Sequence, residues 1–258
     1  MSTDVMMEQI AGASPRLRAR TAGALWLIII VAASFSEFFV RGRIVVDGDA
    51  AATATNILAH EPLYRLGAAA ALIYLLCDTA VALILYELLK PVSRSLSLLA
   101  SFFRLAMVAI LGSNLLNLFA PLVLLKGAPL LTAFKAEQLQ ALALVSLKVY
   151  AQVFFIPAML FFGFHCLLIG YLIYRSTFLP RILGALMAIT GLCYLTNSFA
   201  NVLSPALAAR LFTYLMPLGL PGELSLTLWL LAIGVNVQRW KDQAGAAEEW
   251  RSQRAMNA

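Results

Sequence analysis

Six long apolar stretches, separated by segments that contain Lys, Arg or Pro, make up most of this 258-residue chain. A helix needs about 20 apolar residues to cross the hydrocarbon core of a bilayer. The period-two alternation that marks the strands of a membrane barrel is absent from the sequence. We therefore predict an all-α fold, a polytopic membrane helical bundle with six transmembrane helices over residues 21–40, 66–89, 96–125, 149–174, 182–203 and 211–237.

The loop after the first span is predicted to contain a short helix. Asp49 is a favourable N-cap residue, and Thr53 lies four residues further on. The helix is expected over residues 50–60, and Glu61-Pro62 is expected to end it. We expect this outer-loop helix to lie across the outer mouth of the bundle.

Prolines interrupt two of the predicted spans. Pro157 is expected to kink the fourth helix, and residues 137–148 before it are predicted to form an interfacial helix that runs into this span. The run 217–222 contains two prolines and a glycine, and it predicts a broken sixth helix with Glu223 at the start of the second half. Broken helices at membrane depth are tolerated only where they face protein or a cavity, so the sixth span gives the strongest local indication of a site.

Glycines recur seven residues apart in the fourth and fifth spans. Gly163 and Gly170 return to nearly the same helix face, and so do Gly184 and Gly191. Small residues on one face allow helix backbones to approach each other closely. We therefore predict that these two faces are used for close helix packing.

Composition and charge support a membrane protein. Hydrophobic residues account for 62% of the chain and charged residues for 12%, whereas soluble domains carry about 25% charged residues. The net charge of +6 is attributed to anchoring at the membrane surface, and nucleic-acid binding is not expected. Basic residues are more numerous on the side of the two termini. Because basic residues prefer the cytoplasmic side of a membrane, both termini are predicted to be cytoplasmic. Residues 1–20 and 239–258 are then cytoplasmic segments that flank a membrane domain of residues 21–238.

Three ionisable residues are predicted to meet near the middle of the membrane. Each buried charge costs about 2.5 to 3.5 kcal/mol even on the lenient insertion scale, and so it needs a partner. At about 1.5 Å per residue from the cytoplasmic end of each span, Asp78, Arg104 and His165 share one layer. We predict an Asp78–Arg104 ion pair with His165 hydrogen-bonded beside it. Two interpretations stay open: a pair that only fixes the helix register, and a site for a proton or a ligand.

A second polar layer is predicted nearer the outer face. In the fifth span, polar residues from Thr190 to Ser204 recur at steps of three and four residues and form a stripe along one helix face. With polar residues of other spans, this stripe predicts a pocket that opens outward beneath the loop helix. The alternative is a set of hydrogen bonds that only hold the helices together. The predicted pocket residues are Glu37, Asn114, Asn117, Asn197, Asn201 and Glu223.

The sequence lacks motifs for metal or cofactor chemistry. Its two histidines, His60 and His165, do not have metal-ligand spacing, and no phosphate loop, dinucleotide fingerprint or nucleophile elbow occurs. We predict neither a metal nor a cofactor, and we do not favour an enzyme, although acid–base chemistry on the buried groups stays open. Three cysteines within predicted spans are expected to be free thiols: Cys77, Cys166 and Cys193.

Motifs over nearly the whole chain carry a resemblance to a known family. They are Asp49-Ala-Ala-Ala-Thr53 with Asn56-Ile-Leu, Cys77-Asp78 followed by Leu85-Tyr86-Glu87-Leu-Leu-Lys-Pro91, Phe161-Phe-Gly-Phe-His165-Cys-Leu-Leu-Ile-Gly-Tyr171, Leu179-Pro-Arg-Ile-Leu-Gly184, and Gly222-Glu223-Leu-Ser-Leu with Leu228-Trp229-Leu. In combination they resemble the bacterial integral membrane proteins catalogued as domain of unknown function 4386. The resemblance implies a six-helix protein of the bacterial inner membrane with no established activity. It also implies an acidic residue in the family at the position of Asn197.

Among functions, the sequence favours the binding or transport of a small molecule or lipid through the outward-facing polar pocket. A structural or accessory membrane subunit is the first alternative, and an intramembrane acid–base enzyme is the second. The expected partners are membrane lipids and a small-molecule or lipid ligand.

Overall fold

The computed structural model describes residues 14–127 and 132–256, and these residues are predominantly helical. Helices with the length and hydropathy of membrane spans occur six times within the described residues, which confirms the predicted fold class. They are Pro15–Ile44, Glu61–Leu89, Arg94–Leu125, Ala136–Arg175, Arg181–Leu203 and Pro205–Ala232.

Several of these spans consist of more than one element. The first contains α2 (Pro15–Ser34), the π-helical segment η1 (Phe35–Arg41) and α3 (Gly42–Ile44). The second and third are α5 (Glu61–Leu89) and α6 (Arg94–Leu125). The fourth contains α7 (Ala136–Val153), η3 (Phe154–Ala158) and α8 (Met159–Arg175). The fifth and sixth are α9 (Arg181–Leu203) and α10 (Pro205–Ala232), while α4 (Ala50–Ala59) and α11 (Val237–Met256) lie outside the spans.

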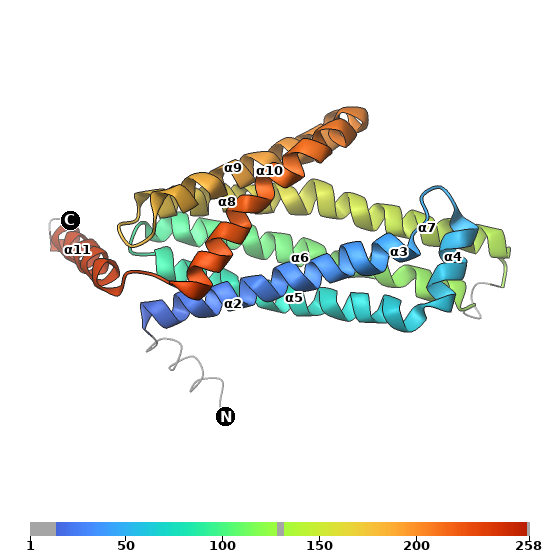
Figure 1. Ribbon diagram of the computed structural model, residues 1–258, viewed down its shortest axis with the longest axis horizontal. Helices are drawn as coiled ribbons and strands as arrows, with labels where there is room; N and C mark the ends of the chain where they lie inside the picture. The colour runs from blue at the N-terminus through green and yellow to red at the C-terminus, as the bar shows by residue number, and fades with distance from the viewer. Residues whose placement is uncertain (1–13, 128–131, 257–258) are drawn as a thin grey trace, which may run out of the picture.

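The six spans form a closed ring. Each span packs against its neighbours in the chain, and α2 of the first span also packs against α10 of the last. The start of α2 and the helix α11 lie at the same end of the bundle, whereas α4 lies at the opposite end (Figure 1). Large apolar side chains such as Leu76, Leu116 and Leu203 are exposed. Exposed apolar surface of this kind is what contact with lipid requires.

The loop helix α4 forms as predicted and lies at the end of the ring. Asp49 caps it, because its Oδ1 accepts a hydrogen bond from Ala52 N at 2.8 Å. Thr53 has a different role from a cap: its Oγ1 bonds both the N–H and the carbonyl of Val46, at 3.0 and 3.2 Å, and holds the loop against α4. α4 packs against α6 and α7. Pro62 lies in the first turn of α5, where a proline's missing N–H costs nothing.

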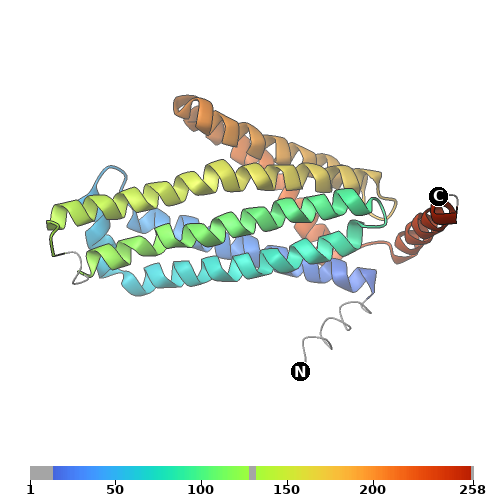
Figure 2. The same ribbon diagram turned by 180° about the vertical axis from the view of Figure 1, so that it is seen from behind.

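A helix covers residues 137–148 and runs directly into the fourth span, as predicted. α7 continues through η3 into α8, so that one helix runs from Ala136 to Arg175 (Figure 2). Buried side chains of α7, among them Leu147 and Tyr150, fix it along α6 and α4. Pro157 lies in the π-helical turn η3, where the wider turn accommodates the missing N–H and the helix continues.

The sixth span is bent, not broken as predicted. α10 runs without interruption from Pro205 to Ala232, and Figure 1 shows a change of direction along its length. Its two internal prolines remove only two backbone donors. α9 supports this region, because Thr190 Oγ1 donates a hydrogen bond to the carbonyl oxygen of Gly219 at 2.6 Å. The helix also ends at Ala232, five residues before the predicted end of the span.

The glycine faces pack against each other, as the spacing predicted. A Cβ atom added to Gly170 would lie 2.7 Å from the carbonyl oxygen of Gly184, and one added to Gly184 would lie 2.6 Å from that of Gly170. Gly163 and Gly191 form a second such contact, in which a Cβ on Gly191 would lie 2.7 Å from Gly163 O. We call this contact between α8 and α9 the glycine seam.

Candidate functional site

Asp78 of α5, Arg104 of α6 and His165 of α8 meet inside the ring. Arg104 Nε and Nη2 donate to Asp78 Oδ1 at 2.8 and 2.5 Å. Arg104 Nη1 lies 3.1 Å from His165 Nε2. Their exposed fractions are 3% for Asp78, 0% for Arg104 and 1% for His165. The predicted ion pair is therefore present, with the histidine beside it.

The contacts of His165 determine its hydrogen-bonding state. Its Nδ1 lies 2.8 Å from the carbonyl oxygen of Ala100, which can only accept a hydrogen bond. Nδ1 must therefore carry the hydrogen. The guanidinium of Arg104 can only donate, so Nε2 is the acceptor. These two partners fit the neutral imidazole with its hydrogen on Nδ1, and they place His165 as an acceptor for Arg104.

Aromatic rings enclose the guanidinium of Arg104. Its Cζ lies 4.4 Å from the ring centroid of Trp26 on α2 and 5.5 Å from that of Phe162 on α8. A cation over an aromatic face gains about 2 kcal/mol or more where both groups are desolvated. Sequence reasoning missed Trp26 and Phe162, because an aromatic residue within an apolar span gives no sign of whether it faces lipid or protein.

Glu223 of α10 joins this cluster and does not lie in the outer layer where it was predicted. Tyr194 Oη donates a hydrogen bond to Glu223 Oε1. Arg104 and Trp26 also lie within interaction range of its carboxyl group. The reason is the early end of α10: Glu223 lies nine residues before Ala232, or about 14 Å along the helix. Asp78, Arg104 and His165 lie at similar distances from the same ends of their helices, at about 15–17 Å.

Three of the predicted pocket residues form a separate group nearer α4. Glu37 of η1 forms an ion pair with Arg41 at 2.7 Å and accepts a hydrogen bond from Tyr150 Oη at 2.9 Å. Asn114 Nδ2 donates to Tyr150 O at 2.9 Å, and Asn117 Nδ2 donates to Asn114 Oδ1 at 3.0 Å. Tyr150 was not predicted as a member, yet it links the others. This group is internally hydrogen-bonded.

Asn197 and Asn201 form a third group on α9. Asn201 Nδ2 donates to the carbonyl oxygen of Asn197 at 2.8 Å. The side chain of Asn197 is fully buried, and neither its Nδ2 nor its Oδ1 has a hydrogen-bond partner among the described residues. Asn197 lies one helical turn beyond Tyr194 on the same helix. The six residues predicted to form one pocket are thus divided among three places.

An unsatisfied polar atom lies next to the charged cluster as well. Within the described part of the chain, the buried Thr227 Oγ1 makes no hydrogen bond. Thr227 follows Glu223 by one turn of α10, so the two side chains are neighbours. The cluster around Arg104 and Glu223 therefore combines charge, burial and spare hydrogen-bonding capacity. The three cysteines take no part in disulfides and are free thiols, as predicted.

Comparison with known proteins identifies the family. A family model described as Domain of unknown function (DUF4386) matches residues 21–234. The chain belongs to this family. It is also similar to an uncharacterized protein of Archaeoglobus fulgidus, with 28% identity over 160 residues, which cover 62% of this chain and 78% of that protein. No solved structure matches the chain.

In this DUF4386 protein, every span contributes to the buried cluster. Trp26 comes from α2, Asp78 from α5, Arg104 from α6, His165 and Phe162 from α8, Tyr194 from α9, and Glu223 from α10. All of them lie within the region that the family model matches. A cluster with this composition can bind a polar group and can hold a proton between the carboxyl, phenol and imidazole groups.

Proposed function

We propose that this DUF4386 protein binds a small molecule, or the polar part of a lipid, inside the ring beside Glu223. The unsatisfied polar atoms of Thr227 and Asn197 carry this proposal. A buried donor or acceptor without a partner costs about 1–3 kcal/mol. A ligand that supplies hydrogen-bond partners to these atoms would recover that free energy on binding, so the site favours an occupied state.

The polar face of α9 supports a route by which a ligand could reach this site from the outer end of the ring. Tyr194, Asn197 and Asn201 follow each other at steps of three and four residues and therefore share one face of the helix. They lead from Glu223 towards the end of α9 where α10 begins. We propose this face as the route for a ligand, with transport as the extended form of the same function.

A structural or accessory role is the second candidate, and one observation favours it. Asp78, Arg104 and His165 satisfy one another and Ala100 O without any further group. A buried network of this kind can fix how α5, α6 and α8 pack. We place an acid–base enzyme third, because the histidine is committed to two hydrogen bonds.

Ligand retention tests the proposal directly. We expect native mass spectrometry of protein extracted in lipid discs to show a bound species on the wild type, and its bound fraction to fall at least tenfold in Glu223→Gln. The loss follows because a buried ligand group that is left without its hydrogen-bond partner loses about 1–3 kcal/mol.

Glu87→Gln is the matched control, since Glu87 pairs with Lys90 at 2.6 Å near the end of α5, away from the cluster. A bound species that persists equally in both variants would contradict the proposed site. A wild-type protein that carries no ligand would contradict the proposed function.

We further propose that the protein lies in the bacterial inner membrane with both termini in the cytoplasm. A fluorescent protein fused after residue 258 is expected to be fluorescent, and alkaline phosphatase at the same place to be inactive. The same phosphatase inserted at Gly48, in the loop before α4, is expected to be active, because this loop lies at the other end of the ring (Figure 1). Phosphatase activity at residue 258 with none at Gly48 would reverse the topology.

A further inference from the structure

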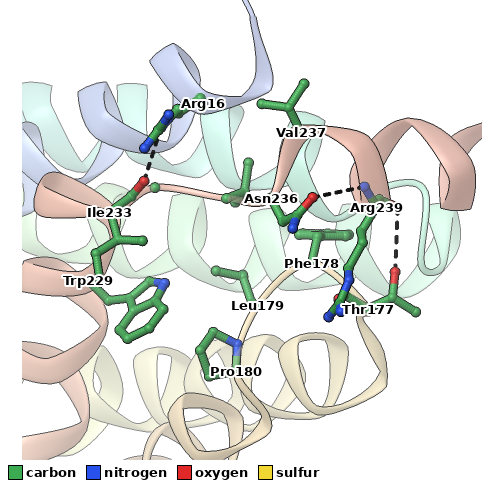
Figure 3. A pocket seen from close by; sticks show the side chains of 12 residues that line it. Arg16, Thr177, Phe178, Leu179, Pro180, Trp229, Ile233, Asn236, Val237 and Arg239 are labelled. Carbon is green, nitrogen blue, oxygen red and sulfur yellow. Dashed lines mark hydrogen bonds between the residues drawn. The ribbon is translucent and has the colours of Figure 1, made fainter.

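A second site lies at the end of the ring where α2 begins. A cavity of about 580 Å³ lies between the start of α2, the turn from α8 to α9 and the turn from α10 to α11 (Figure 3). A neighbouring cavity of about 770 Å³ shares Thr177, Leu179 and Arg239 with it. Four arginines line the combined space: Arg16, Arg175, Arg181 and Arg239. We call this space the arginine pocket.

Carboxylates of the described residues do not neutralise the charge of the arginine pocket. Among the described residues, none of the four arginines forms an ion pair with a carboxylate. Arg16 Nε instead donates to Ile233 O at 3.3 Å, and Arg239 Nη1 donates to Thr177 O at 3.4 Å. The acid in the lining is Asp242, whose Oδ1 accepts a hydrogen bond from Gln238. Four cations facing one acid attract an anion.

The start of α9 adds to this attraction. Pro180 and Arg181 line the cavities, and no side chain caps the first turn of this 23-residue helix. Uncapped N–H groups at a helix N-terminus favour an anion, and phosphate groups are common ligands there. The start of α11 differs, because Asn236 Oδ1 accepts a hydrogen bond from Arg239 N at 3.1 Å.

The remaining lining shows what kind of anion fits. Phe178, Leu179 and Ile233 give the pocket apolar walls, and Trp229 lies at its edge (Figure 3). The pocket lies at the ends of the spans, where tryptophan residues gather at the membrane interface. Its surroundings thus combine cations with apolar surface at the level of lipid headgroups.

We propose that the arginine pocket binds the phosphate headgroup of an anionic phospholipid, with the start of the acyl chains against the apolar walls. Basic pockets between transmembrane helices at the membrane surface bind such headgroups. The site is separate from the cluster around Glu223. Its occupant would hold α2, the α8–α9 turn and α11 together at one end of the ring.

Titration with phosphatidylglycerol in discs of phosphatidylcholine tests this site. Native mass spectrometry is expected to show saturable binding of phosphatidylglycerol to the wild type. Each arginine near a membrane surface contributes about fivefold to the affinity for anionic lipid, so Arg175→Gln/Arg239→Gln is expected to bind about 25-fold more weakly. Arg94→Gln/Lys241→Gln is the control, because it removes the same charge at the same end from exposed residues outside the lining.

Two outcomes of this experiment would overturn the proposal. Equal weakening in both double variants would show a general surface charge effect. Displacement of phosphatidylglycerol by millimolar inorganic phosphate would show that the pocket recognises a free anion and not a lipid. If the first double variant does not fold, Arg16→Gln/Arg181→Gln replaces it, with the same expected loss. Glu223→Gln is expected to bind phosphatidylglycerol normally, which separates this result from the test of the proposed function.

Discussion

Asp78→Asn is expected to lower the free energy of unfolding by about 3–5 kcal/mol. The variant leaves the guanidinium of Arg104, with an exposed fraction of 0%, without its counter-charge. His165 accepts only one of its N–H groups, and the rings of Trp26 and Phe162 do not replace a carboxylate. Thermal unfolding of purified protein in detergent, followed by tryptophan fluorescence, measures the loss.

Arg65→Gln provides the control for this prediction. It removes an ion pair with Glu61 in which the Arg65 side chain is 54% exposed, and exposed pairs contribute about 0–1 kcal/mol. If Asp78→Asn is no less stable than Arg65→Gln, the buried pair does not hold the ring together.

The double variant Asp78→Asn/Arg104→Gln separates the two roles of the pair. It removes both charges, so most of the stability lost in the single variant is expected to return. A double variant that is stable and still retains the ligand would show that the pair acts only in packing. A double variant that is stable but has lost the ligand would show that the pair belongs to the binding site.

The sequence allowed the central ion pair to be predicted because helix rise is constant. Depth follows from the number of residues to the end of a span, and the predicted ends near Asp78, Arg104 and His165 agree closely with α5, α6 and α8. The depth of Glu223, counted in the same way, was wrong because α10 ends at Ala232 and not at Val237. The apolar run continues past the helix end as the loop that Gly234 turns, with φ of 77°.

Other members of the cluster could not be predicted, because they depend on how the ring closes. Trp26 lies beside Arg104 in a ring that α2 closes by packing against α10, a contact between the two ends of the sequence. Tyr194 lies one helical turn after Thr190, on the face of α9 that carries the polar stripe. This spacing was visible in the sequence, but it was not used to predict Tyr194 as a member. The arginines of the pocket were counted as loop charges, and only the fold brings Arg16 near Arg239.

A large side chain placed in the glycine seam is expected to destabilise the protein strongly. Gly184→Leu is expected to lower the free energy of unfolding by about 3 kcal/mol or more, the upper end for overpacked sites. The new Cβ would lie 2.6 Å from Gly170 O and 2.7 Å from Tyr174 N. Both are backbone atoms, so no side-chain rotation relieves the clash, and α8 must move away from α9. Thermal unfolding in detergent again measures the effect.

Gly112→Leu is the matched control, because no atom lies within 4 Å of a Cβ added to Gly112 of α6. We expect it to be neutral or slightly stabilising, since glycine within a helix costs about 1 kcal/mol relative to alanine. Equal stability of the two variants would show that the seam is not tightly packed.

The smaller change Gly184→Ala tests whether packing in the seam also affects the binding site. Gly184 lies ten residues before Tyr194 on α9, or about 15 Å along the helix, and touches no member of the cluster. The seam nevertheless sets the distance between His165 on α8 and Tyr194 on α9. We therefore expect Gly184→Ala to fold and to retain less ligand than Gly112→Ala. Equal retention would mean that the binding site does not depend on how closely the two helices approach.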